Sequence, residues 1–277
     1  MSTSDRDGPA YTHGHHESVL RSHRWRTAEN SAAYLLAHLA PGLRVLDVGC
    51  GPGTITLDLA RLVAPGAVVG IEPPSEIVEA AARDAVAQGV DNASFTVGDV
   101  YALDLDTLDP EGRPFDVVHA HQVLQHVPDP VGALRAMRAA CAPDGLVAAR
   151  DSDYHAFTWY PADPRLDRWL ELYQEVARAD GGEPDAGRML GAWAHAAGFA
   201  EVTSSASVWC FASDEDRAWW GGLWADRVTS SRLATRAQEL GLADERELAE
   251  LAAAWRAWAA HPDGWFAVLH GEILCRP

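Results

Sequence analysis

The sequence predicts an α/β protein with a doubly wound, mostly parallel sheet that is covered by helices on both faces. Over residues 41–152, short apolar runs rich in branched side chains alternate with longer stretches whose apolar residues recur at helical spacing. This alternation is typical of strand–helix–strand units that build a parallel sheet. The first run, "LRVLDVGC", is apolar on both of its faces, as a central strand is when helices lie on both sides of the sheet.

Each element of this part has its own signal. Apolar residues at helical spacing predict a helix over about 18–39, which Pro41 and Gly42 end. After the first strand, the pattern predicts a helix at "ITLDLARLV", a strand at "AVVGIE", a helix over 75–88, strands at "ASFTVGD" and "FDVVHAH", a helix over about 130–141 and a strand at "GLVAARDS". Ligands of such sheets bind at the carboxyl ends of the strands, so we expect functional side chains there.

The pattern changes after residue 152. Ten of the eleven tryptophans lie between Trp159 and Trp265, mostly in stretches with helical spacing. Two strand-like stretches, "EVTSSASVWCF" and "WFAVLHGEILCR", predict an antiparallel pair that completes the sheet. A helical insert over about 214–262 lies between them and could cover the ligand cleft. We therefore expect one globular domain with an N-terminal helical segment (1–40), a ligand-binding core (41–152) and a substrate-side part (153–277).

Composition and charge exclude several classes of function. The chain carries 40 acidic residues against 22 lysines and arginines, for a net charge of −18, and has no basic cluster. This charge disfavours nucleic acid and anionic membranes as partners. There is no apolar run long enough to span a membrane and no signal-peptide pattern at the start, so we expect a cytoplasmic protein.

The cysteines and histidines do not predict a metal site. The four cysteines lie far apart and form no C-x-x-C pair. Four histidines, at positions 13, 15, 16 and 23, could supply ligands, but a metal site needs fixed geometry, which is uncommon close to a chain end. We expect no metal.

The glycine-rich loop "GCGPGT", residues 49–54, joins the first strand to a helix. Such a loop brings backbone amides and a helix N-terminus against a ligand. A dinucleotide-binding loop has the pattern G-x-G-x-x-G, whereas here Thr54 occupies the place of the third glycine. Asp47, inside the preceding strand, would repel a pyrophosphate and attract an ammonium group. The loop therefore favours a zwitterion with a cationic end, and an NAD-dependent dehydrogenase stays as an alternative.

These residues resemble class I S-adenosylmethionine-dependent methyltransferases. "VLDVGCGPGT" is similar to the first motif of that family, and "GIE", "GDV" and "FDVVHAHQVLQHVPDP" are similar to its later motifs in order and spacing, over roughly residues 35–152. The stretch "VLQHVPD" most resembles the ubiquinone- and menaquinone-biosynthesis type of small-molecule methyltransferases. The resemblance implies a Rossmann-like sheet of seven strands with an antiparallel last strand, and a transferase that uses S-adenosylmethionine and releases S-adenosylhomocysteine.

The resemblance also implies the roles of single residues. Glu72 would accept hydrogen bonds from both ribose hydroxyls, and Asp99 would accept one from the adenine amino group while the Val100 amide donates to the ring. Either acid alone could be a helix cap or a turn residue. The N-terminal segment would close over the cofactor. Pro73 and Pro74 depart from the family pattern because they remove two amide donors after Glu72. The expected cofactor-binding residues are Tyr11, Asp47, Gly49, Gly51, Gly53, Glu72, Pro73, Asp99, Val100, His121 and Gln122.

Few residues in the sequence indicate which side chains take part in methyl transfer. A sulfonium methyl is already activated, so catalysis can come largely from holding the acceptor atom in line with it, and a base is needed only if the acceptor must lose a proton. The candidate bases are His121, His126 and His155. We favour His121 and His155 because each follows the carboxyl end of a predicted strand. A hydrogen-bonded structural role is the commoner one for each histidine.

The acceptor is expected to be an apolar small molecule, methylated on oxygen, carbon or nitrogen. The tryptophan-rich part could line a pocket for an aromatic acceptor, although most of its rings should pack between helices. Trp159, Tyr160, Trp219 and Trp220 are the expected substrate contacts. A non-catalytic module that only binds S-adenosylmethionine is a further alternative. If the chain forms a homo-oligomer, the N-terminal segment and the insert are the expected contact surfaces.

Overall fold

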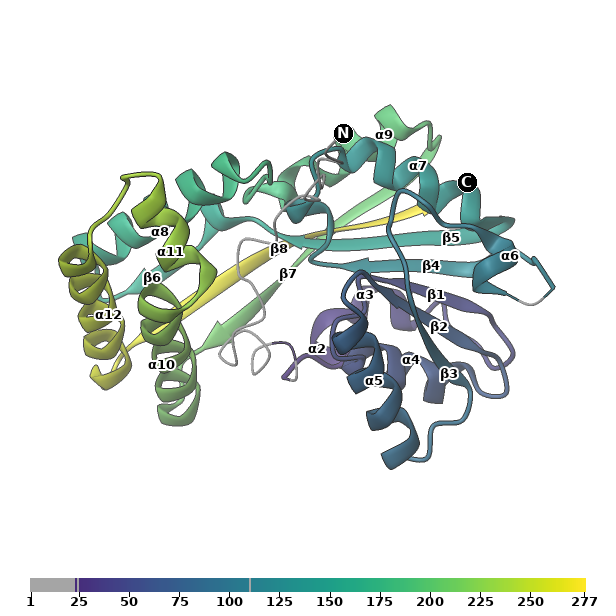
Figure 1. Ribbon diagram of the computed structural model, residues 1–277, viewed down its shortest axis with the longest axis horizontal. Helices are drawn as coiled ribbons and strands as arrows, with labels where there is room; N and C mark the ends of the chain where they lie inside the picture. The colour runs from purple at the N-terminus through teal and green to yellow at the C-terminus, as the bar shows by residue number, and fades with distance from the viewer. Residues whose placement is uncertain (1–22, 24, 110) are drawn as a thin grey trace, which may run out of the picture.

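The computed structural model describes residues 23, 25–109 and 111–277. Its centre is a mixed sheet with the strand order β3-β2-β1-β4-β5-β8-β6, and β7 pairs with β8 as well (Figure 1). The first five strands are parallel, whereas β8 runs antiparallel to β5, β6 and β7. The strands are β1 Val45–Val48, β2 Val68–Glu72, β3 Ala93–Val97, β4 Phe115–His121, β5 Cys141–Ser152, β6 Thr158–Tyr160, β7 Glu201–Phe211 and β8 Trp265–Arg276.

Helices cover both faces of the parallel strands, which explains why these strands are apolar throughout. On β4, Val117 packs in one core with α4, while its neighbour Val118 packs in another core with α7 and α9. The helices of this part are α2 Ala28–Ser31, α3 Ala33–Leu36, α4 Thr54–Val63, α5 Ser75–Ala87, α6 Leu105–Leu108, α7 Pro130–Ala140 and α9 Leu190–Ala197, with 3₁₀ turns η1 Leu124–His126, η2 Tyr154–Ala156 and η3 Ala186–Met189.

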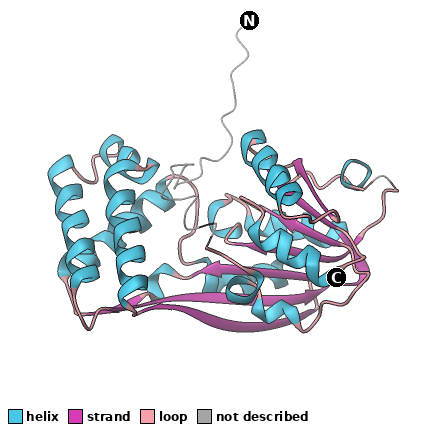
Figure 2. Cartoon of the chain, turned by 90° about the horizontal axis from the view of Figure 1, so that it is seen from below, coloured by secondary structure: helices cyan, strands magenta, loops and turns pink. Residues whose placement is uncertain are grey.

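A third core holds most of the tryptophans. It lies among the helices α8 Pro164–Ala179, α10 Asp214–Ser230, α11 Arg232–Glu239 and α12 Glu245–Ala260, which gather at one end of the long strands β7 and β8 (Figures 1 and 2). Trp169 meets Trp224 and Trp255 edge to face, with ring centroids 4.5 and 4.7 Å apart. These rings are fully buried, so they stabilise the helical lobe.

The predicted fold class is confirmed, including the antiparallel last strands and the helical insert between them. The sheet also contains β6, a three-residue strand that pairs with the start of β8 and was not predicted from the sequence. Among the described residues, no helix is long and apolar enough to cross a membrane.

The N-terminal helix differs from its prediction. Over residues 25–39 it contains two four-residue helices, α2 and α3, which are separated at Ala32 by a non-helical backbone. The indole N–H of Trp209 donates to the carbonyl oxygen of Asn30, which is the acceptor that the Tyr34 amide would use in a continuous helix. A contact from β7 therefore competes with the helical hydrogen bond, and local spacing does not show it.

Candidate active site

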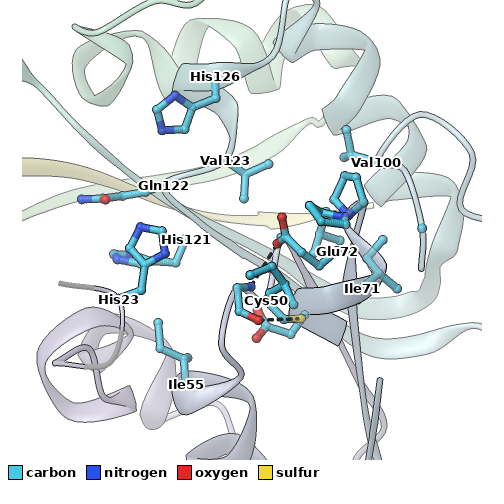
Figure 3. Close-up of a pocket in the computed structure, with 18 of the residues that line it drawn as sticks. His23, Cys50, Ile55, Ile71, Glu72, Val100, His121, Gln122, Val123 and His126 are labelled. Atoms are coloured by element: carbon cyan, nitrogen blue, oxygen red, sulfur yellow. Dashed lines mark hydrogen bonds between the residues drawn. The ribbon is translucent and has the colours of Figure 1, made fainter. Parts of the chain in front are cut away.

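A cavity of about 420 Å³ lies at the carboxyl ends of β1, β2 and β4, where the sequence predicts the site (Figure 3). Its volume is in the usual range for sites that bind small molecules. We call it the larger cavity. Of the expected cofactor-binding residues, it is lined by Asp47, Gly49, Gly51, Glu72, Pro73, Asp99, Val100, His121 and Gln122. Tyr11 lies outside the described residues.

Two glycines of the loop have different roles. Gly49 lines the larger cavity with a φ of +68°, and a Cβ atom at this position would lie 2.5 Å from a methyl carbon of Val123. Gly53 does not line the cavity. It precedes α4 with a φ of +81°, and a Cβ atom there would lie 2.8 Å from the ring of Phe95. This placement favours a packing role for Gly53.

Asp47 is held by the protein itself. It is only 2% exposed; one of its carboxylate oxygens accepts from the Thr56 hydroxyl at 2.6 Å, and the other lies 2.8 Å from Nδ1 of His119. The side chain thus has structural partners, yet it places a carboxylate in the wall of the larger cavity.

Glu72, the last residue of β2, is a carboxylate of the cavity wall with a perturbed pKa. Its Oε2 atom accepts a hydrogen bond from the Gly51 amide at 3.0 Å. Burial raises the pKa of Glu72, and the nearby carboxylate of Asp47 raises it further, while the Gly51 amide opposes the shift. A desolvated carboxylate at a strand end is a strong acceptor for ligand hydroxyl groups.

Asp99 lies at the rim of the larger cavity. Its Oδ1 atom accepts from the Tyr101 amide at 2.9 Å, so the side chain closes a turn as well as facing the cavity. Val100, by contrast, is buried in the wall.

His121 ends β4 and is 5% exposed. Neither of its ring nitrogens has a hydrogen-bond partner among the described residues. Burial holds the pKa of His121 well below its usual value, and the positive charges of Arg26 and Arg150 lower it further. His121 is therefore neutral near pH 7 and a weak base. His126 also lines the cavity, and burial lowers its pKa to about 3.

Gln122 has a φ of +54°, the only positive φ of a non-glycine residue in the described chain. Its side-chain amide donates to Oγ of Ser152 at 2.8 Å and lies 2.9 Å from Nε2 of His270, while its carbonyl oxygen accepts from Arg26. Nδ1 of His270 lies 3.1 Å from the carbonyl oxygen of Val268, so we assign the ring proton to Nδ1, and Nε2 then accepts from Gln122. These contacts fix the side chain of Gln122.

A smaller cavity of about 20 Å³ adjoins the larger one, and His23, Arg26 and Gln122 line both. Its wall is largely aromatic. The remaining lining residues are Trp25, Ser152, Tyr154, Phe157, Trp209, Trp219, Trp220, Trp224, Arg227 and Val268. Gln122 therefore stands between the larger cavity and an aromatic one.

The structure separates the expected substrate contacts into two pairs. Trp219 and Trp220, on α10, line the smaller cavity. Trp159 and Tyr160 line neither cavity, because β6 pairs with β8 and directs them elsewhere. Trp159 stacks on Phe266 with ring centroids 5.5 Å apart, and Tyr160 is 56% exposed.

His155 lies outside the lining of both cavities. It is exposed, and its backbone amide donates to Asp185. This placement disfavours His155 as the base. Among the described residues, no group of three histidine, cysteine, aspartate or glutamate side chains could hold a metal ion. His13, His15 and His16 lie outside that part of the chain.

Several lining residues of the two cavities were not predicted from the sequence. Val123 and Val127 belong to the quoted motif "VLQHVPD", so the motif itself was the available signal. Trp25, Arg26 and Arg227 come from the N-terminal segment and from α10, and no local pattern shows that they meet.

Comparison with known proteins shows the family of the chain. Residues 39–214, more than half of the chain, match a family described as a methyltransferase domain. The chain is 34% identical over 273 residues to an uncharacterized methyltransferase of Schizosaccharomyces pombe, with 95% of each chain covered. It is 38% identical over 108 residues to the ubiquinone biosynthesis O-methyltransferase of Methylocella silvestris, a match that covers 39% of each protein.

Solved structures show the same fold. The YcgJ protein from Bacillus subtilis superposes with a TM-score of 0.56 at 20% identity, covering 89% of this chain and 97% of that one. At this identity the likeness concerns the fold alone.

Proposed function

Because the chain belongs to the S-adenosylmethionine-dependent methyltransferases, we propose that it methylates an oxygen, carbon or nitrogen atom of an aromatic small molecule. The observation that carries this proposal is the meeting of the two cavities at Gln122. The larger cavity would hold S-adenosylmethionine and the smaller aromatic cavity would receive the acceptor.

The residues of the larger cavity fit S-adenosylmethionine. Its wall includes the carboxylates of Asp47, Glu72 and Asp99, which favour a ligand with sulfonium and ammonium charges. Glu72 would bind the ribose hydroxyls, as an acid at the end of the second strand does in nucleotide-binding sheets. When bound, S-adenosylmethionine supplies an electrophilic methyl group, and the acceptor atom bonds to it as the carbon–sulfur bond breaks, leaving S-adenosylhomocysteine.

The protein contributes by positioning the two reactants and by excluding water from the acceptor. Gln122 is fixed by Ser152, His270 and Arg26, so it gives the boundary between the cavities a defined shape. The aromatic rings of the smaller cavity exclude water from the acceptor. His121 and His126 have lowered pKa values, so neither is assigned the removal of a proton from the acceptor.

The proposal is tested by incubating the protein with methyl-labelled S-adenosylmethionine and a small-molecule extract of its source cells. We expect a labelled aromatic product in the mass spectrum. Binding of S-adenosylhomocysteine without any labelled product would favour the non-catalytic module. The NAD-dependent dehydrogenase is excluded as the main activity by the family to which the chain belongs.

We further propose that the enzyme acts in small-molecule or secondary metabolism in the cytoplasm. All four cysteines are free thiols, as is usual in a reducing compartment. Fractionation of the source cells, followed by detection of the protein with an antibody, tests this assignment.

A further inference from the structure

We propose that the acceptor is an aromatic compound with an anionic oxygen, which the guanidinium group of Arg227 binds in the smaller cavity. This inference rests on the proposed function, because it concerns the acceptor of the same site. It replaces the expectation of a purely apolar acceptor with a more specific class of compound.

The two cavities differ in charge. Three carboxylates, those of Asp47, Glu72 and Asp99, line the larger cavity together with one guanidinium group, that of Arg26. Among the described residues, the lining of the smaller cavity contains Arg26 and Arg227 and no carboxylate. This is notable in a chain with 40 acidic residues against 22 basic ones. The walls thus favour a cation in the larger cavity and an anion in the smaller one.

Arg227 is well placed to bind an anion. It lies on α10, is 4% exposed, and its guanidinium carbon is 5.1 Å from the ring centroid of Trp224. The planar guanidinium carries five N–H donors, so it can bind a ligand oxygen in addition to its contacts within the protein.

Arg26 extends the positive wall to the point of reaction. It lines both cavities and donates to the carbonyl oxygen of Gln122, which marks their boundary. An anionic oxygen near this boundary would need no base to activate it. That matches the weak basicity of the two histidines in the larger cavity, His121 and His126.

The other side chains that line the smaller cavity favour an aromatic ligand. Trp219 and Trp220 of α10 face the cavity together with Trp209 of β7 and Trp25, and large aromatic faces favour stacking with a flat ligand. The free volume of about 20 Å³ has room for roughly one water molecule, so the acceptor must displace side chains. The contact between Trp25 and Trp219, with ring centroids 5.3 Å apart, joins the N-terminal segment to α10 and is the expected place of opening.

Two ligands of the same shape test the charge requirement. We would titrate 2-naphthoate and 2-naphthamide into the full-length protein saturated with S-adenosylhomocysteine and measure both affinities by calorimetry. The carboxylate should bind at least about tenfold more tightly than the amide, because charged hydrogen bonds to a buried guanidinium are strong. The Arg227→Gln variant should lose this preference, and Arg227→Lys should keep part of it.

Arg217→Gln is the matched control. Arg217 is also a buried arginine of α10, but it pairs with Asp214 and lies outside the lining of both cavities. This variant should keep the preference for naphthoate. The comparison of the two ligands on the wild-type protein remains decisive even if a variant fails to fold.

A third ligand distinguishes the two sources of an anionic oxygen. If 2-naphthol binds near neutral pH with the absorption spectrum of its anion, the arginines bind a phenolate. If naphthoate binds tightly while naphthol keeps its neutral spectrum, they bind a carboxylate.

Equal affinities for naphthoate and naphthamide, or binding of neither by a protein that binds S-adenosylhomocysteine, would overturn the inference and leave the proposed function standing. Failure to bind S-adenosylhomocysteine would instead count against the proposed function.

Discussion

Replacement of Glu72 by glutamine tests the larger cavity in depth. Glutamine keeps the size of the side chain and can still accept the hydrogen bond that the Gly51 amide now donates to Glu72 at 3.0 Å. What it removes is the negative charge at the end of β2, the group expected to bind the ribose hydroxyls. The effect of Glu72→Gln on affinity therefore reports on that charge.

The size of the effect follows from the hydrogen bonds that are weakened. Hydrogen bonds to a charged group contribute roughly 1.5–3 kcal/mol, which corresponds to about 10- to 150-fold in affinity. We expect a loss of this size for S-adenosylhomocysteine, measured by calorimetry. Glu79→Gln is the control, because Glu79 lies on α5 outside the cavity lining and is 70% exposed; its affinity should change less than about twofold.

Glu72→Gln should weaken ligand binding, but it should not lower the stability of the ligand-free protein. Burial raises the pKa of Glu72 in the folded protein, so the ionised carboxylate costs folding free energy at every pH above its folded pKa, and the cost disappears below its unfolded pKa. Glu72→Gln should therefore leave the melting temperature of the ligand-free protein unchanged or raise it near neutral pH. Affinity within about twofold of wild type, or a loss of affinity that accompanies a lower melting temperature, would refute this reasoning.

Three further predictions follow from particular positions. Gly49→Ala and Gly53→Ala should each lower the free energy of unfolding by at least about 1–2 kcal/mol, because an alanine would have a positive φ. Only Gly49→Ala should also weaken binding of S-adenosylhomocysteine; equal losses of affinity would contradict the packing role of Gly53. Burial raises the pKa of Asp151 to about 7, so stability should fall as the pH rises toward that value, and Asp151→Asn should flatten the decline in denaturation experiments. His155→Ala should leave the yield of labelled product unchanged, whereas Trp219→Ala, in the wall of the smaller cavity, should reduce it; the reverse order would reject the placement of the acceptor.

The parallel core could be predicted from the sequence because its signals are local. The strands β1, β2 and β4 are short apolar runs. The loop at Gly49 directly follows the carboxyl end of β1, and Glu72 is the last residue of β2. Since parallel strands end at one edge of the sheet, sequence position alone brings these residues to one cavity.

The smaller cavity could not be predicted in the same way. Its wall combines Trp25, Trp209 and Arg227, which are far apart in sequence and meet through long-range packing. The hydrogen bond from Trp209 to Asn30 interrupts the expected N-terminal helix for the same reason. The sequence does not distinguish Trp159 from Trp219 as a substrate contact. Only the pairing of β6 with β8 directs Trp159 away from the smaller cavity and onto Phe266.

A crystal structure of the complex with S-adenosylhomocysteine is the most direct measurement. We expect the ribose hydroxyls beside the carboxylate of Glu72 and the sulfur atom facing Gln122 at the boundary of the smaller cavity. A ligand bound elsewhere, or one whose sulfur is separated from the smaller cavity, would contradict methyl transfer between the two cavities.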